Sequence, residues 1–194
     1  TPKPAMVYTD EDGNFMGRYY LNPREKKAVN FRGTTALYVQ SRDDVRVFNQ
    51  KQLERQKKYL LTQSSYWKVD QVEKYENLKT PADIYNFINN NFSYDYQRVN
   101  KNLKRLGAEA ALKSPDKAVC VEFSDSFVAL AREKGIFARE IEGYGFSNDP
   151  QLRPLSLITD VLHSWPEYYD QENNEWISID PTWQNTSGID YLTS

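Results

Sequence analysis

The sequence contains one cysteine and one histidine among 194 residues. A single cysteine excludes an internal disulfide bond. The two residues together are also too few for a structural zinc site, which takes about four ligands of these types. No segment follows the calcium-binding pattern of an EF-hand loop. We therefore expect a protein that folds and acts without a metal ion or another cofactor.

The sequence also lacks a large excess of either charge and has no long apolar segment. Basic and acidic residues are interspersed and sum to a formal net charge of -2, which argues against a nucleic-acid partner. No apolar run reaches the roughly 18 residues that a transmembrane helix requires. Because the first residue is Thr1 rather than Met, we expect that a leader was removed from an exported or bacterial cell-surface protein, with cytoplasmic residence as the alternative. None of these features determines the oligomeric state.

The chain is long enough for one domain with an extension, and its hydrophobic content of 39% can fill a core. We interpret residues 1–75 as an N-terminal accessory region and residues 76–194 as the main domain. In the accessory region, the pattern of apolar and turn residues predicts a hairpin, a further strand and a helix. These elements are expected at residues 6–21, 34–40 and 43–61.

The first strong helix signal lies at the start of the main domain. Thr80 suits the N-cap, Pro81 the first helical position, and Asp83 completes a capping box. The helix should bury an apolar face that consists of Ile84, Phe87 and Ile88. Further along, the pattern predicts a short helix and a turn, at residues 103–112 and 114–116.

The best-formed helical pattern in the sequence begins at Cys120. Apolar side chains recur there at helical spacing and form one stripe, made of Cys120, Phe123, Phe127, Leu130 and Ala131. Gly135 is the expected C-terminal stop. At the N-terminus of a helix, unpaired amides and the helix dipole favour a thiolate and can also bind an oxyanion. Cys120 is therefore either a nucleophile or simply the first core residue, and the helix alone does not separate the two.

Two acidic residues, Glu122 and Asp125, follow the cysteine in the early turns of this helix. Both suit the positive end of the helix dipole. A carboxylate aimed at the sulfur would, however, oppose formation of a thiolate. We expect both side chains to face away from Cys120.

The segment after this helix predicts an antiparallel sheet that carries the only histidine. A strand is expected at residues 136–144, followed by a long irregular connection at residues 145–159. Two apolar runs come next, VLHSWPEYYD at residues 161–170 and EWISID at residues 175–180, as in a β-hairpin. Because Pro166 lies within the first run, we expect an edge or bulged position there.

The register of this hairpin decides whether Asp180 can contact His163. With a two-residue loop, Asp180 would share a face with His163 but stand too far along the strand. With a wider loop that pairs Asp170 with Glu175, it would stand opposite Trp165, diagonal to the histidine and within reach of its side chain. We predict the wider loop or a bulge. The alternative interpretation is that Asp180 only ends the strand in a turn.

These segments resemble the transglutaminase-like superfamily, a branch of the papain-like cysteine enzymes. The matching pieces are a cysteine-led helix with its following strand, a His-x-Trp strand and an Asp-Pro-Thr turn, at residues 118–144, 163–169 and 176–183. The resemblance implies that Cys120 is the nucleophile, His163 the base and Asp180 the orienting group. Trp165 matches the aromatic residue beside the histidine, which we interpret as packing. The resemblance also implies an α+β fold, in which the thiol-bearing helix packs on an antiparallel sheet bearing His and Asp.

Three residues depart from the family pattern. Ala118 stands where glycine is usual, Phe137 where proline is usual, and Pro166 where an aliphatic residue is common. These departures affect local geometry more than chemistry. One oxyanion donor should be the backbone N–H of Cys120. The second donor stays open among three aromatic residues, Tyr94, Tyr96 and Trp183.

The resemblance implies a thiol-dependent acyl-transfer enzyme that acts on amide bonds of protein or peptide substrates. A thiol nucleophile needs a base, and the base needs a carboxylate or amide that fixes its tautomer, which is the set of residue types found here. We favour a cysteine protease or amidase over a crosslinking transglutaminase. The alternative is a binding or scaffolding module that keeps the fold without catalysis.

Overall fold

The computed structural model describes residues 2–10, 14–30, 42–64, 66–99, 103–144 and 162–187. The chain divides into two compact units, Thr1–Arg42 and Asp43–Ser194, each held together by its own internal contacts. Within the described ranges, no helix has both the length and the apolar character needed to cross a membrane.

The first unit contains a two-stranded antiparallel hairpin. β1 (Met6–Thr9) pairs with β2 (Phe15–Arg18), so that Val7 stands opposite Gly17. The predicted hairpin is confirmed, and only its second strand is shorter than expected, since it ends at Arg18 and not at residue 21. The residues of both strands are exposed. The strand expected at residues 34–40 lies outside the described residues.

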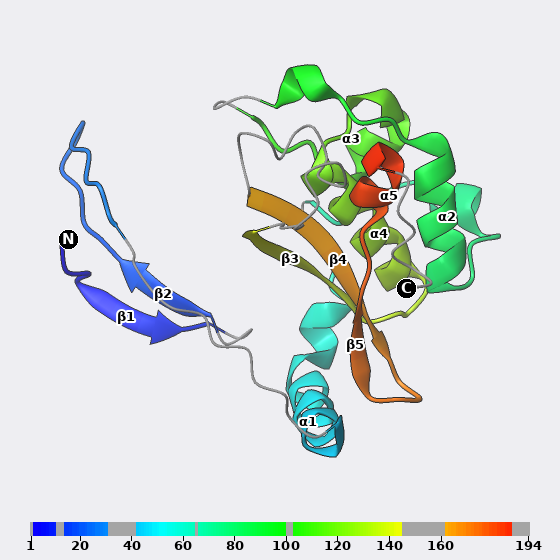
Figure 1. Cartoon of the computed structure of the whole chain (residues 1–194), viewed down its shortest axis with the longest axis horizontal. Helices are drawn as coiled ribbons and strands as arrows, with labels where there is room; N and C mark the ends of the chain where they lie inside the picture. The colour runs from blue at the N-terminus through cyan, green and yellow to red at the C-terminus, as the bar shows by residue number, and fades with distance from the viewer. Residues whose placement is uncertain are drawn as a thin grey trace. The chain divides into compact units, whose positions relative to one another are not determined.

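The second unit combines a three-stranded antiparallel sheet with helices on both of its faces (Figure 1). The strands follow the order β3-β4-β5 and are β3 (Ala138–Tyr144), β4 (Leu162–Asp170) and β5 (Glu175–Ser178). The helices are α1 (Arg42–Leu60), α2 (Pro81–Asn91), α3 (Ala108–Lys113), α4 (Cys120–Glu133) and α5 (Pro181–Ser187). Short 3-10 helices are η1 (Val72–Tyr75), η2 (Tyr96–Arg98) and η3 (Pro115–Lys117). The predicted α+β class is confirmed.

α2 begins where the sequence predicted. Thr80 Oγ1 accepts the N–H of Asp83 at 3.1 Å, and Asp83 Oδ2 accepts the N–H of Thr80 at 2.9 Å, which completes the capping box. Pro81 occupies the first helical position, where no intrahelical bond is lost. The buried face consists of Ile84, Tyr85 and Ile88. Phe87, which we expected in this face, is only partly buried and packs edge-on against Tyr75, with 5.5 Å between the ring centroids.

Gly107 sets the start of α3. The helix expected from residue 103 begins only at Ala108, because Gly107 has a φ of +83°, a left-handed conformation that does not continue a helix. A β-carbon at this position would lie 3.2 Å from the Cα of Tyr66, so the close approach of the two backbone segments also disfavours a side chain. The glycine therefore precedes the helix and does not weaken its interior.

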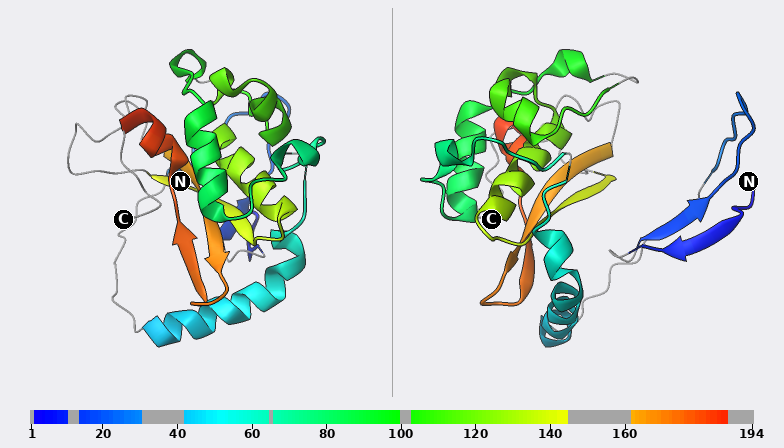
Figure 2. Two further views of the ribbon diagram at one scale, coloured as in Figure 1. Left: turned by 90° about the vertical axis from the view of Figure 1, so that its right-hand side faces the viewer. Right: turned by 180° about the vertical axis from the view of Figure 1, so that it is seen from behind.

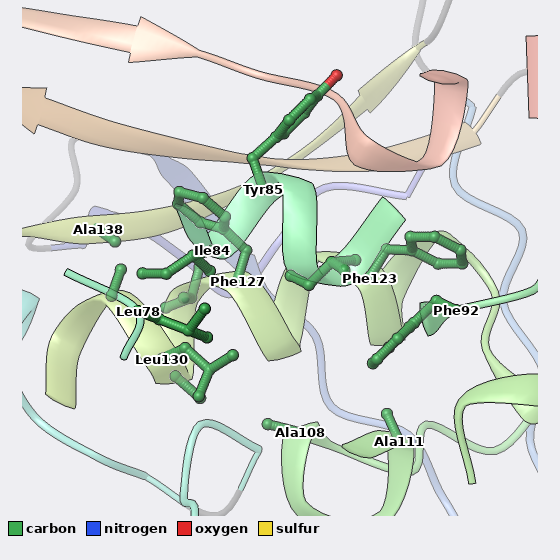
Figure 3. Packing of buried hydrophobic residues seen from close by; sticks show 14 of the residues in the cluster. Leu78, Ile84, Tyr85, Phe92, Ala108, Ala111, Phe123, Phe127, Leu130 and Ala138 are labelled. Atoms are coloured by element: carbon green, nitrogen blue, oxygen red, sulfur yellow. The ribbon is translucent and has the colours of Figure 1, made fainter. Parts of the chain in front are cut away.

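α4 runs through the middle of the second unit. Apart from Cys120, the predicted apolar stripe is buried, and the side chains on the other faces of the helix are buried as well from Glu122 to Arg132. Figure 3 shows Phe123 and Phe127 of α4 among the side chains of neighbouring elements, with the rings of Phe92 and Phe123 5.3 Å apart. The helix ends at Glu133, and Gly135, with a φ of +73°, turns the chain toward β3 as predicted.

The sheet has a different partner on each face. Side chains on one face join the core around α4, among them Tyr168 and Ile177. On the opposite face Tyr169 packs with Leu53 and Leu60 of α1, and Figure 2 shows α1 passing beneath the β4–β5 hairpin. α1 thus belongs to the same compact unit as the sheet, although it lies within the region expected to be accessory. The functional boundary between accessory region and main domain stays a prediction.

The β4–β5 hairpin has the wider of the two loops considered. Asp170 pairs with Glu175 as predicted, and the ladder continues to the end of β5. β4 is the central strand, so the expectation that Pro166 marks an edge or a bulge is wrong. The strand accommodates the proline because the ladder to β5 stops at this point: Ile179 donates its N–H to the carbonyl of Pro166 at 3.1 Å, and the proline has no N–H to return. The chain thereby leaves the sheet directly before Asp180.

Candidate active site

Cys120 is the first residue of α4 and is partly exposed. Val119 is the N-cap, so Cys120 occupies the first helical position, where the backbone N–H has no carbonyl acceptor within the helix. Its partial exposure contrasts with the burial of the residues that follow from the second turn onward. The thiol therefore stands at the N-terminus of a buried helix, as the sequence predicted.

His163 and Asp180 form a buried hydrogen bond. His163 Nε2 lies 2.6 Å from Asp180 Oδ2, and each residue is 5% exposed. His163 belongs to β4, whereas Asp180 lies between the end of β5 and the start of α5. The second carboxylate oxygen, Oδ1, accepts the N–H of Trp183 at 2.9 Å and so caps α5. One carboxylate thus orients the imidazole and starts a helix.

Two tryptophan rings enclose the imidazole. The ring of Trp165 stacks on His163 with 5.9 Å between centroids and an angle of 25°, and the ring of Trp183 lies at 5.5 Å. Gly143 of β3 stands opposite His163, and a β-carbon on this glycine would come within 2.9 Å of the Cη2 atom of Trp165. Because Gly143 has no side chain, it provides the space that the stacked ring of Trp165 occupies. The packing role expected for Trp165 agrees with this arrangement.

The pKa of His163 is raised by its two partners. Burial of the ring lowers the pKa, but the hydrogen bonds and charges of Asp180 and Cys120 outweigh burial and bring it to about 9. Nε2 is the ring nitrogen engaged with Asp180, so Nδ1 takes no part in this hydrogen bond.

The two acidic residues near the thiol are engaged elsewhere, as expected. Glu122 and Asp125 are fully buried. Glu122 pairs with Arg98 at 3.0 Å, and Asp125 accepts hydrogen bonds from Nε and Nη2 of Arg105. Burial raises the pKa of Asp125 to about 7, although the bonds to Arg105 act in the opposite direction. Sequence reasoning missed both arginines because they lie 24 and 20 residues from their partners, beyond any helical spacing.

The three candidates for a second oxyanion donor lie near the start of α4 or near His163. Tyr94 forms a β-bridge with Ala118, and the ring of Tyr96 lies 4.9 Å from that of Tyr94. The third candidate, Trp183, packs beside the imidazole. The assignment of a donor stays a prediction. Across the described ranges, no three His, Cys, Asp or Glu side chains are grouped as metal ligands.

The sequence also matches a known family over its central part. The model of the transglutaminase-like superfamily matches residues 67–181, more than half of the chain, and this segment contains Cys120, His163 and Asp180. The chain belongs to the transglutaminase-like superfamily. A comparison with curated proteins gave no match for this superfamily member.

Solved structures similar to this transglutaminase-like protein come from two bacteria. A protein from Cytophaga hutchinsonii, whose name provisionally assigns it as a cysteine protease, matches with a TM-score of 0.50 and 26% sequence identity, over 63% of this chain and 40% of that chain. The periplasmic domain of TgpA from Pseudomonas aeruginosa matches with a TM-score of 0.46 and 20% identity, over 68% of this chain and 48% of that chain. The transglutaminase-like chain thus spans less than half the length of either structure.

Proposed function

We propose that this transglutaminase-like protein is a thiol-dependent acyl-transfer enzyme that acts on amide bonds of protein or peptide substrates. The supporting observation is the buried, carboxylate-bound imidazole of His163, whose pKa is raised by Asp180 and by Cys120, a partly exposed thiol at a helix N-terminus. In this proposal Cys120 is the nucleophile, His163 transfers protons, and Asp180 fixes the orientation of the ring.

The proposed reaction starts from a thiolate and an imidazolium. The sulfur of Cys120 attacks the carbonyl carbon of the amide, the π electrons move to oxygen, and the backbone N–H of Cys120 binds the oxyanion. His163 gives its Nδ1 proton to the amine as the C–N bond breaks, which leaves a thioester and a neutral imidazole. The imidazole then takes a proton from the incoming nucleophile, which attacks the thioester and releases the thiolate.

The incoming nucleophile distinguishes two branches of the proposal. Water gives a cysteine protease or amidase, whereas a lysine amine gives a crosslinking transglutaminase. We favour hydrolysis, and the likeness to the Cytophaga hutchinsonii protein, which is provisionally assigned as a cysteine protease, supports this branch.

The test uses the fact that the chain has one cysteine and one histidine. The rate of alkylation by iodoacetamide is measured at pH 7 for the wild type and for His163→Ala, with glutathione as the free thiol. We expect the wild-type thiol to react faster than glutathione and His163→Ala to remove this advantage. Equal rates for all three would contradict an activated thiol.

The same preparations distinguish the two acceptors. Release of amines from casein and from a mixed fluorogenic peptide library reports hydrolysis, and incorporation of a dansylated primary amine into casein reports crosslinking. Cys120→Ser serves as the inactive control in both assays. Hydrolysis without amine incorporation is the expected result, and the opposite pattern would assign the transglutaminase branch.

The second candidate function is a binding or scaffolding module. The hairpin of the first unit favours it, because apolar side chains are exposed along both strands, with Phe15 84% and Val7 62% exposed. This candidate predicts that Cys120→Ser behaves as the wild type in every assay. A loss of amide cleavage in Cys120→Ser would contradict it.

A further inference from the structure

Glu122 lies two residues after the thiol, and its fully buried carboxylate accepts hydrogen bonds from four donors. Oε2 accepts the N–H of Val119 at 3.0 Å, and Oε1 accepts the N–H of Leu106 at 2.8 Å. Arg98 donates to both oxygens, at 3.0 and 3.2 Å. Val119 has no side-chain acceptor for the usual N-cap bond, so Glu122 supplies the side-chain part of this helix start. The carboxylate therefore acts on the residue directly before Cys120.

Arg98 also bonds directly to the backbone of the turn before Cys120. Its guanidinium donates to the carbonyl of Lys117. The carbonyl of Ala118 accepts the N–H of Asp95 at 2.8 Å, from the chain segment that also carries Arg98. Each of the three residues before Cys120 is thus fixed through a backbone group, and the buried ion pair makes two of these three bonds.

We propose that Arg98 and Glu122 are positioning residues of the acyl-transfer site, an inference that rests on the function proposed above. The backbone N–H of Cys120 belongs to the same peptide unit as the carbonyl of Val119. The orientation of this peptide therefore sets the direction of the N–H. An oxyanion donor acts only when it is aimed at the point where charge develops in the transition state. The ion pair fixes the two peptide units before this one, through the N–H of Val119 and the carbonyl of Lys117, and the backbone of Val119 carries this orientation to the N–H of Cys120. It leaves the sulfur and the imidazole to their own partners.

Both charges are needed for this geometry. A carboxylate has two accepting oxygens and serves the backbone N–H groups and the guanidinium at once. Glu122→Gln replaces one oxygen with an NH2 group, which would face other donors and break part of the set. Arg98→Lys keeps the positive charge, but a single ammonium does not reproduce the planar fork that reaches both the carboxylate and the carbonyl of Lys117.

The experiment compares Glu122→Gln with Asp125→Asn. Asp125 lies one turn further along α4, is equally buried and is paired with Arg105, but its side-chain bonds do not reach the turn before Cys120. For each variant, we measure kcat and KM for peptide cleavage and the rate of alkylation by iodoacetamide. The temperature is kept below the melting temperatures of both variants. Alkylation requires no oxyanion donor, so it separates an effect on the N–H from an effect on the thiol.

We expect Glu122→Gln to lower kcat about 10- to 100-fold, with KM and the alkylation rate changed less than about 3-fold. Asp125→Asn should keep kcat within about 3-fold of the wild type. Arg98→Lys, at a side chain that is 18% exposed, should lower kcat in the same way. This variant keeps the test decisive if Glu122→Gln does not fold.

Four results would overturn the inference. Equal losses of kcat in Glu122→Gln and Asp125→Asn, in step with their melting temperatures, would assign a purely structural role. A parallel loss of alkylation would place the effect on the thiol instead of the N–H. An inactive wild type would instead refute the proposed function and, with it, this inference, whereas an active wild type with unaffected variants would refute the inference alone.

Discussion

Asp180 binds His163 through one carboxylate oxygen and caps α5 through the other. The distances are 2.6 Å from Oδ2 to His163 Nε2 and 2.9 Å from Oδ1 to the backbone nitrogen of Trp183. Both contacts require an acceptor, and a carboxylate supplies two, whereas an amide supplies one. The helix that follows the sheet therefore favours aspartate over asparagine at this position.

Asp180→Asn is expected to lower kcat/KM about 100- to 10,000-fold, because the single amide oxygen cannot both cap α5 and hold the imidazole tautomer. The pKa of His163 should fall, since it loses the charge of Asp180. Nitrogen-15 NMR follows the titration directly, because the chain has one histidine. The control is Asp170→Asn, whose carboxylate accepts the N–H groups of the hairpin loop at the other end of β4. An unchanged His163 pKa in Asp180→Asn would contradict the contact.

The alkaline side of the pH–activity profile should report His163. An imidazolium is needed to protonate the leaving amine, and the raised pKa keeps it protonated up to about pH 9. kcat/KM for peptide cleavage should therefore be maintained through neutral pH and fall with a midpoint near 9. Cys120→Ser should be inactive, but NMR should show a lower pKa for its imidazole, because Cys120 contributes to the shift. An alkaline midpoint near 6.5 would contradict this assignment.

The stability of the fold should also depend on the protonation of His163. The pKa of His163 in the folded protein, about 9, is above the ordinary value of 6.5, so the folded state binds the proton more tightly. This contribution is fully present below pH 6.5 and is lost as the pH rises through about 9. Urea unfolding at pH 6 and pH 10, compared between the wild type and His163→Gln, measures it. The difference between the two proteins should shrink at pH 10, and a difference that grows would contradict the sign.

Gly143→Ala should reduce activity through Trp165. The new β-carbon would stand 2.9 Å from the Trp165 ring, which must move away from its stacked position on His163. We expect a loss of about 10-fold in kcat/KM. The matched control is Gly135→Ala, where no atom lies within 4 Å of the new β-carbon but φ is +73°. It should destabilise the protein by about 1–2 kcal/mol without lowering kcat/KM, and equal activity losses in both variants would contradict the role of the ring.

Leu60→Ala tests whether α1 is an integral part of the second unit. Leu60 is fully buried and packs with Phe137 and Tyr169 of the sheet region. Its truncation should lower the free energy of unfolding by about 2–5 kcal/mol. The control is Phe48→Ala on the same helix, where the side chain is 60% exposed and the change should stay within about 0.5 kcal/mol. Equal and small effects would mean that α1 contributes little to this core.

Local signals in the sequence predicted most of the elements near the site. The capping box of α2 and the glycine at the end of α4 act within a few residues, so their patterns are visible without the fold. The register of the hairpin followed from alternation and loop width, and it placed Asp180 within reach of His163. These predictions succeeded because each depends on short-range geometry.

Features that depend on tertiary contact were not predicted. The bonds from Arg98 to Glu122 join segments 24 residues apart, and no periodicity links them. Pro166 was expected at an edge or a bulge. This expectation was wrong because the missing N–H faces β5 where the ladder stops, and the sequence does not show where β5 ends. Gly107 was expected inside a helix because propensity alone does not reveal a left-handed backbone. In each case a partner far along the chain decided the outcome.

α4 is enclosed by its neighbours along most of its length, and only the residues at its two ends reach solvent. A helix in this setting does not fray or open by itself, so its amide protons should exchange with solvent only when the whole unit unfolds. No partly disordered intermediate would then exist in which the fold remains and the helix that carries Cys120 is lost. Thermal inactivation and global melting should accordingly coincide as one cooperative transition.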